Sequence, residues 1–176
     1  MKKMSTRQLA TDAMLAAMCA VLGYLSLDLG NVKITFESFP VLMAALLFGP
    51  VDGMAVGGVG TLIYQLVRYG VTATTPLWIL PYVACGAVVG LYARKKQFAP
   101  ARGQVLFITV AAELLVTVLN TGVLYLDSRI YGYYFPGIIL GVLALRLALC
   151  IGKAIVYGLV LPVVLRPIRR SYGMNS

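Results

Sequence analysis

Three charged side chains stand inside long apolar stretches of this sequence and are the first candidates for chemistry: Glu113, Arg146 and Lys153. A charge is costly in apolar surroundings, so such residues usually pair with one another or mark a site. Counting along the two stretches at about 1.5 Å per residue places Glu113 and Lys153 at similar depth. We therefore expect these two side chains to form a structural ion pair.

The same count places Asn120 beside Arg146, nearer the other end of the two stretches. Glu113 and Asn120 lie seven residues apart, as do Arg146 and Lys153, so each pair shares one helix face. Arg146 then has no acid of its own, and a planar guanidinium suits the carboxylate of a ligand. Two alternatives stay open, namely that Arg146 also pairs with Glu113 or that it reaches Asp127.

Residue types for catalysis or metal binding are scarce. The chain has no histidine, and its six acidic residues are scattered. Its three cysteines, Cys19, Cys85 and Cys150, lie far apart in apolar runs, without a C-x-x-C or zinc spacing. No G-x-x-x-x-G-K-[ST] loop for nucleotide phosphates is present. We expect no metal site, no cofactor and no enzymatic activity in this chain, and we disfavour a small membrane protease or lipid transferase.

The elements that must position these side chains are membrane-spanning helices. Hydrophobic residues make up 60% of the 176, charged residues only 12%, and the mean hydropathy is +0.88. Soluble domains carry about 25% charged residues, and about 20 apolar residues cross a bilayer as a helix. We predict an all-α integral membrane domain of six transmembrane helices over residues 1–176, with spans at about 12–27, 38–51, 53–67, 76–92, 104–126 and 136–165.

Lysine and arginine are unequally shared between alternate loops. The two termini and the loop between the fourth and fifth spans hold ten, against three (Lys33, Arg68 and Arg129) on the other side. The positive-inside rule then places both termini in the cytoplasm. This distribution accounts for the net charge of +9 without a nucleic-acid partner. Asp12 interrupts the first apolar run, so we expect that run to be retained in the membrane.

Small residues four apart recur in the first four spans. Gly49, Gly53 and Gly57 form such a series, as do Gly86 and Gly90. Because small residues allow helix backbones to approach closely in a membrane, we expect these glycines to pack the bundle internally. The first span carries two alanine pairs, Ala13 with Ala17 and Ala16 with Ala20, which we interpret as a docking face for another membrane protein.

The loops opposite the termini are rich in polar and aromatic residues. Residues 28–37 contain a Gly-Asn turn signal and are predicted to form a small lid, while Trp78 follows several threonines and could stack on a flat ring. Tyrosines at 131–134 fit either a pocket or an aromatic belt at the membrane surface. We expect ligand contacts from Lys33, Phe36, Tyr64, Gln65, Arg68, Trp78, Asn120 and Arg146.

Several stretches resemble the substrate-binding S components of energy-coupling factor (ECF) vitamin transporters. They are the Ala13/Ala17 segment, residues 34–40, the Phe48-Gly49-Pro50-x-x-Gly53 element, Asn120-Thr121 and Leu145-Arg146. The resemblance covers nearly the whole chain and is greatest to the folate-type branch. Residues 64–68 and 74–78 depart from that branch, which has an acidic residue and a Pro-Gly-Phe-Thr-like motif there.

The resemblance implies a six-helix protein of the cell membrane that binds a vitamin from outside, folate being the best guess and pantothenate an alternative. It also implies docking, through the face with Ala13 and Ala17, onto a transmembrane T component that carries two cytoplasmic ATPases. ATP would then be used by the partner subunits. A rival interpretation is a channel-like or structural membrane subunit, which would bind no small molecule tightly.

Overall fold

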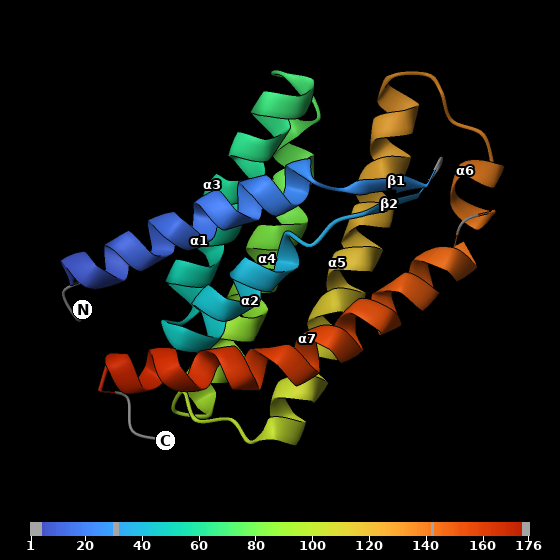
Figure 1. The fold of residues 1–176 in the computed structure, drawn as a ribbon. Helices are drawn as coiled ribbons and strands as arrows, with labels where there is room; N and C mark the ends of the chain where they lie inside the picture. The colour runs from blue at the N-terminus through green and yellow to red at the C-terminus, as the bar shows by residue number, and fades with distance from the viewer. Residues whose placement is uncertain (1–4, 30–31, 142, 174–176) are drawn as a thin grey trace.

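The computed structural model describes residues 5–29, 32–141 and 143–173, and shows an all-α bundle with one short hairpin (Figure 1). The side chains of residues 27–33 lie outside the described part. In chain order the elements are α1 (Thr6–Tyr24), β1 (Leu27–Leu29), β2 (Val32–Ile34), α2 (Ser38–Leu47), α3 (Pro50–Tyr69), α4 (Thr75–Lys95), α5 (Arg102–Ile130), α6 (Gly137–Leu140) and α7 (Leu143–Ser171). The antiparallel hairpin pairs Leu27 with Ile34.

The core of the bundle is built around α2, which contacts α1, α3, α4 and α7 (Figure 1). Its apolar side chains are almost fully buried, and Val41, Leu42 and Leu46 each expose 0% of their surface. A helix of ten residues is only about 15 Å long, half the thickness of a bilayer core. Helix α2 is thus a short helix buried at the centre of the bundle.

Most helix ends differ from the predicted spans by a few residues, and two spans differ in how the chain is divided into helices. The predicted span 38–51 ends early, because Gly49 adopts φ +110° and Pro50 begins α3 at its first position. A positive φ is cheap for glycine, and proline needs no helical N–H at the start of a helix. The predicted span 136–165 is divided into α6 and α7, and Val142, between them, is outside the described residues.

Glycines bring α3 and α4 into close contact, as their spacing predicts. A Cβ added to Gly53 would lie 2.9 Å from the Gly86 carbonyl oxygen, and one added to Gly57 would lie 2.7 Å from that of Tyr82. Gly90 packs in the same way against the backbone at Pro50. Such distances leave no room for a side chain, so the two backbones touch.

The start of α1 meets the end of α7 (Figure 1). Arg7 Nη1 donates to the Ser171 carbonyl at 2.8 Å, and the hydroxyls of Thr11 and Tyr172 lie 2.6 Å apart. The start of α1 and the end of α7 therefore lie at the same end of the bundle.

Large apolar side chains cover the outside of the molecule. Val118 on α5 is 66% exposed, and Leu159 and Val163 on α7 are 68% and 67% exposed. Judged by length and composition, three stretches of the described chain are able to cross a membrane: Thr75–Lys95, Arg102–Ile130 and Gly137–Ser171. An exterior of this kind is suited to lipid rather than to water.

Candidate ligand-binding site

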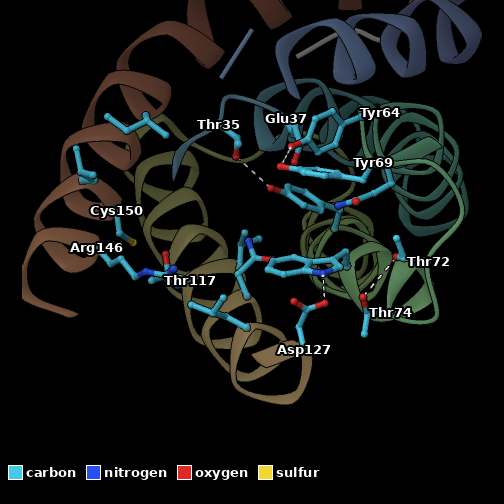
Figure 2. Close-up of a pocket in the computed structure, with 18 of the residues that line it drawn as sticks. Thr35, Glu37, Tyr64, Tyr69, Thr72, Thr74, Thr117, Asp127, Arg146 and Cys150 are labelled. Atoms are coloured by element: carbon cyan, nitrogen blue, oxygen red, sulfur yellow. Dashed lines mark hydrogen bonds between the residues drawn. The ribbon is translucent and has the colours of Figure 1, made fainter. Parts of the chain in front are cut away.

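A cavity of about 510 Å³ opens between the hairpin and α3, α4, α5 and α7 (Figure 2). Its walls combine aromatic rings with a small number of polar groups, which is the usual composition of a small-molecule site. Five residues predicted from the sequence line it together: Tyr64, Gln65, Trp78, Asn120 and Arg146. Lys153, predicted only as part of an ion pair, also reaches this cavity.

Arg146 extends from α7 into the cavity (Figure 2). Its Nη1 donates to the Thr121 hydroxyl at 3.3 Å, while its Nε is buried and makes no hydrogen bond within the described part of the chain. Asn120 lines the same cavity, but Thr121, one residue further along α5, is the direct partner. The guanidinium therefore still has an N–H group, at Nε, that can donate a hydrogen bond to an anionic group.

Lys153 and Glu113 form the expected ion pair, with 2.8 Å between Nζ and Oε2. Glu113 is fully buried, and the Lys153 side chain is 16% exposed. Lys153 Nζ also donates to the Thr35 carbonyl at 3.3 Å, which ties α7 to the segment after β2. These contacts hold Lys153 in the ion pair, and Arg146 is the cation of the cavity lining that has no acidic partner among the described residues.

A second part of the cavity wall is organised by Asp127, near the end of α5. Its carboxylate accepts a hydrogen bond from Trp78 Nε1 at 3.3 Å and another from the Tyr133 hydroxyl (Figure 2). Partial burial, followed by the bond to Asp127, raises the pKa of the Tyr133 phenol, so this hydroxyl stays protonated and donates. The indole is thereby held at the cavity wall.

The remaining wall comes from the segment leading into α2 and from α3 and α4. The hydroxyls of Thr35 and Tyr82 lie 3.2 Å apart, and the rings of Tyr64 and Tyr69 meet edge to face with their centroids 6.0 Å apart. Glu37, which is 1% exposed, lines the cavity beside them (Figure 2). The predicted lid segment therefore borders the cavity through its last residues.

Several lining residues were missed by the prediction of ligand contacts. They are Ile34, Thr35, Glu37, Tyr69, Thr72, Thr74, Tyr82, Val116, Thr117, Leu124, Asp127, Tyr131, Tyr133, Leu149 and Cys150. For Thr117 a signal existed, because it shares the helix face of Glu113 and Asn120. Tyr131 and Tyr133 line the cavity. From the sequence, a place in an aromatic belt at the membrane surface was equally open for them.

Three predicted ligand contacts are not found in the cavity wall. Arg68 instead donates to the Tyr24 carbonyl at 3.0 Å and to the Ser26 hydroxyl at 3.1 Å, which ties the end of α3 to the end of α1. Phe36 packs against the hydrophobic core. The side chain of Lys33 lies outside the described residues.

The predicted docking face on α1 also needs one correction. Ala13 and Ala17 are exposed, and Ala20 is partly exposed. Ala16, however, is only 7% exposed and packs toward Gly60 of α3. The two alanine pairs lie on adjacent rather than identical faces of the helix, so burying one face against α3 takes Ala16 with it.

Comparison with protein families gives a match over residues 7–165 to the model described as ECF transporter, substrate-specific component. The chain belongs to this family. As an ECF S component it is an integral protein of the cell membrane that binds a substrate for transport and is not an enzyme. A comparison with curated protein sequences gives no match.

Solved structures share the fold across almost the full length of the chain. The S component of a bacterial ECF transporter superposes with a TM-score of 0.65 and 22% identity, covering 94% of this chain and 97% of its own. An S component for biotin gives 0.70 and 18%, covering 96% and 95%. FolT bound with folic acid gives 0.67 and 22%, covering 89% and 91%. At these identities the likeness establishes the architecture.

Proposed function

We propose that the cavity binds a small carboxylated vitamin from the outer side of the membrane, with folate as the first candidate. The observation that carries this proposal is the guanidinium of Arg146, which lines the cavity and keeps an unpartnered, buried Nε. Hydrogen bonds from a guanidinium to a carboxylate are about twice as strong as neutral ones. A carboxylate of the ligand would supply the acceptor that Arg146 lacks.

The rest of the cavity fits the ring of such a ligand. Trp78, Tyr82 and Tyr131 contribute aromatic surface, and Asn120 Oδ1 is a buried acceptor without a hydrogen-bond partner in the described structure. A volume of about 510 Å³ falls within the range of sites for small molecules. A flat ring carrying N–H donors, joined to a carboxylate, complements these groups.

Folate and biotin are both carboxylic acids, and the solved relatives named for them match this chain about equally well. The decisive experiment is equilibrium binding of labelled folate, biotin and pantothenate to the purified protein. We expect one of the three to bind in the nanomolar range. Absence of tight binding for all three would contradict the proposal that the ligand is one of these carboxylated vitamins.

Arg146→Met tests the role of the guanidinium in the same assay. We expect a loss of affinity of about 10- to 100-fold, which corresponds to one strong charge-assisted contact. Arg129→Met is the matched control, because Arg129 lies over the rings of Tyr125 and Tyr134, outside the cavity lining. Equal affinity in the wild type and Arg146→Met would contradict the proposal.

We further propose that the exposed face of α1 docks onto a transmembrane T component that carries two cytoplasmic ATPases. Ala13 and Ala17 form a flat surface there, flanked by the exposed side chains of Met14 (73%) and Val21 (55%). Such a surface permits close approach of a partner helix. The topology prediction places both termini of this chain on the ATPase side.

Alanine-to-tryptophan changes test docking separately from binding. Ala13→Trp and Ala17→Trp should abolish ATP-driven uptake when the chain is produced with a T component and ATPases, while binding by the purified chain is retained. Val118→Trp, at a lipid-facing position of α5, is the control and should leave uptake unchanged. Normal uptake by both alanine variants would exclude this docking face.

A further inference from the structure

A second hollow lies outside the ligand cavity, between the first turns of α5 and the second half of α7. It measures about 270 Å³ and shares no lining residue with the larger cavity. Its walls are apolar over most of their length: Leu106, Leu159, Pro162 and Val163, with Gly103 and Gly158 between them. We call it the α5/α7 groove.

Two glycines give the groove its shape, each in a different way. At Gly158 the helices meet closely, since a Cβ there would lie 3.3 Å from the Leu106 Cα. At Gly103 there is open space instead, with nothing within 4 Å of an added Cβ. The helices therefore touch at Gly158 and leave a channel at the beginning of α5.

The mouth of the groove is positively charged. Arg102 and Arg166 both line it and both are exposed, and none of the eight lining residues is acidic. Arg102 is also the first residue of α5, so the positive end of a 29-residue helix dipole adds to the field. The charges stand beside an apolar channel on a membrane-facing surface, which matches the two parts of a phospholipid.

We propose that the α5/α7 groove binds one anionic phospholipid, with the phosphate between Arg102 and Arg166 and an acyl chain along Leu106, Leu159 and Val163. Charge complementarity and position favour this occupant, because both arginines belong to the basic clusters expected at the cytoplasmic face. Basic pockets between transmembrane helices on that face are suited to acidic lipid headgroups. A bound lipid would join the start of α5 to the end of α7.

Native mass spectrometry of the full-length protein in detergent tests the charge requirement. Phosphatidylglycerol and phosphatidylcholine with the same acyl chains are titrated, and the number of retained lipids is read directly. We expect one phosphatidylglycerol to bind in preference to phosphatidylcholine. Arg102→Gln and Arg166→Gln should each weaken phosphatidylglycerol binding about fivefold. Equal retention of the two lipids by the wild type would overturn the proposal.

A matched control comes from the same loop. Lys95 and Lys96 are exposed cations that do not line the groove, so the Lys95→Gln/Lys96→Gln variant should retain phosphatidylglycerol as the wild type does. A loss equal to that of the arginine variants would show a general surface charge effect and would contradict a defined site.

Gly103→Leu tests the apolar part without changing any charge. The new side chain has space on this helix, so it should fill the channel and lower lipid retention at least fivefold while the melting temperature is kept. Unchanged retention would contradict placement of the acyl chain in the groove. Soluble glycerol 3-phosphate is the last arm: we expect it not to displace the lipid, and displacement at similar concentration would assign the arginines to a free anion instead.

Discussion

Two pairs of neighbouring helices, α3 with α4 and α5 with α7, pack in opposite ways. Between α3 and α4, Gly53 and Gly86 bring the backbones into contact. Between α5 and α7 the close contact at Gly158 lies outside the cavity lining, and beside the cavity the polar side chains of Arg146 and Thr121 face one another instead. Apolar lipid offers helices little hydrophobic drive to associate, so close packing and polar contacts must hold them together.

The difference separates a tightly packed half of the molecule from a half that can accommodate a guest. A glycine contact has one geometry, because no side chain can move aside. A polar contact can exchange partners, so a ligand carboxylate can take up donors of Arg146 without opening the backbone. The ligand site therefore lies where the helices meet through polar side chains rather than through glycines.

The largest effect is expected from breaking the buried ion pair between α5 and α7. Glu113→Gln leaves the Lys153 charge without its carboxylate partner, and removing one member of a buried pair destabilises by about 3–5 kcal/mol. Denaturant unfolding in detergent measures the change. The double variant Glu113→Gln/Lys153→Met should recover most of the loss, and a single variant as stable as the wild type would show that the pair does not hold α5 to α7.

A smaller loss is expected from separating α3 and α4. Gly86→Ala forces a methyl group onto the Gly53 backbone, and overpacking of this kind destabilises by about 1–3 kcal/mol. Gly122→Ala on α5 is the matched control, because a Cβ there has nothing within 4 Å and alanine is favoured over glycine in helices by up to about 1 kcal/mol. Thermal unfolding of the two variants should move in opposite directions; a shift in the same direction would contradict the contrast.

The smallest effect is expected at the cavity wall. Trp78→Phe removes the hydrogen bond to Asp127, while Tyr133 still donates to that carboxylate. The expected loss is about 1 kcal/mol, the net value of one hydrogen bond, read from the same unfolding curves. Tyr134→Phe, whose ring keeps its contact with Tyr125, serves as control. A loss above 3 kcal/mol for Trp78→Phe would mean that this wall is part of the packed core.

The sequence was sufficient for the parts of the fold that depend on local spacing. Apolar runs predicted the helices, and equal depth along antiparallel neighbours predicted the contact of Glu113 with Lys153. Glycine spacing predicted the close contact of α3 with α4. The boundary at Gly49-Pro50 was misplaced because an apolar run continues across it, while the backbone turns there through a positive φ.

The candidate site was only partly predictable, because it is assembled from segments far apart in the chain. In the sequence, Arg68 does not differ from the other cations near the polar loops. Only the fold shows that its guanidinium donates a hydrogen bond to the backbone at the end of α1. Conversely, Glu37 and Tyr82 reach the cavity from the start of α2 and the middle of α4. No spacing in the sequence relates these two residues to Arg146.

In the proposed complex, Arg146 receives the carboxylate of the ligand. The most direct measurement is a cycle of four equilibrium binding constants: the bound vitamin and its methyl ester, each with the wild type and with Arg146→Met. If the two groups interact, esterification should weaken binding to the wild type about 10- to 100-fold and have little further effect in the variant. Equal losses from esterification in both proteins would contradict the claim.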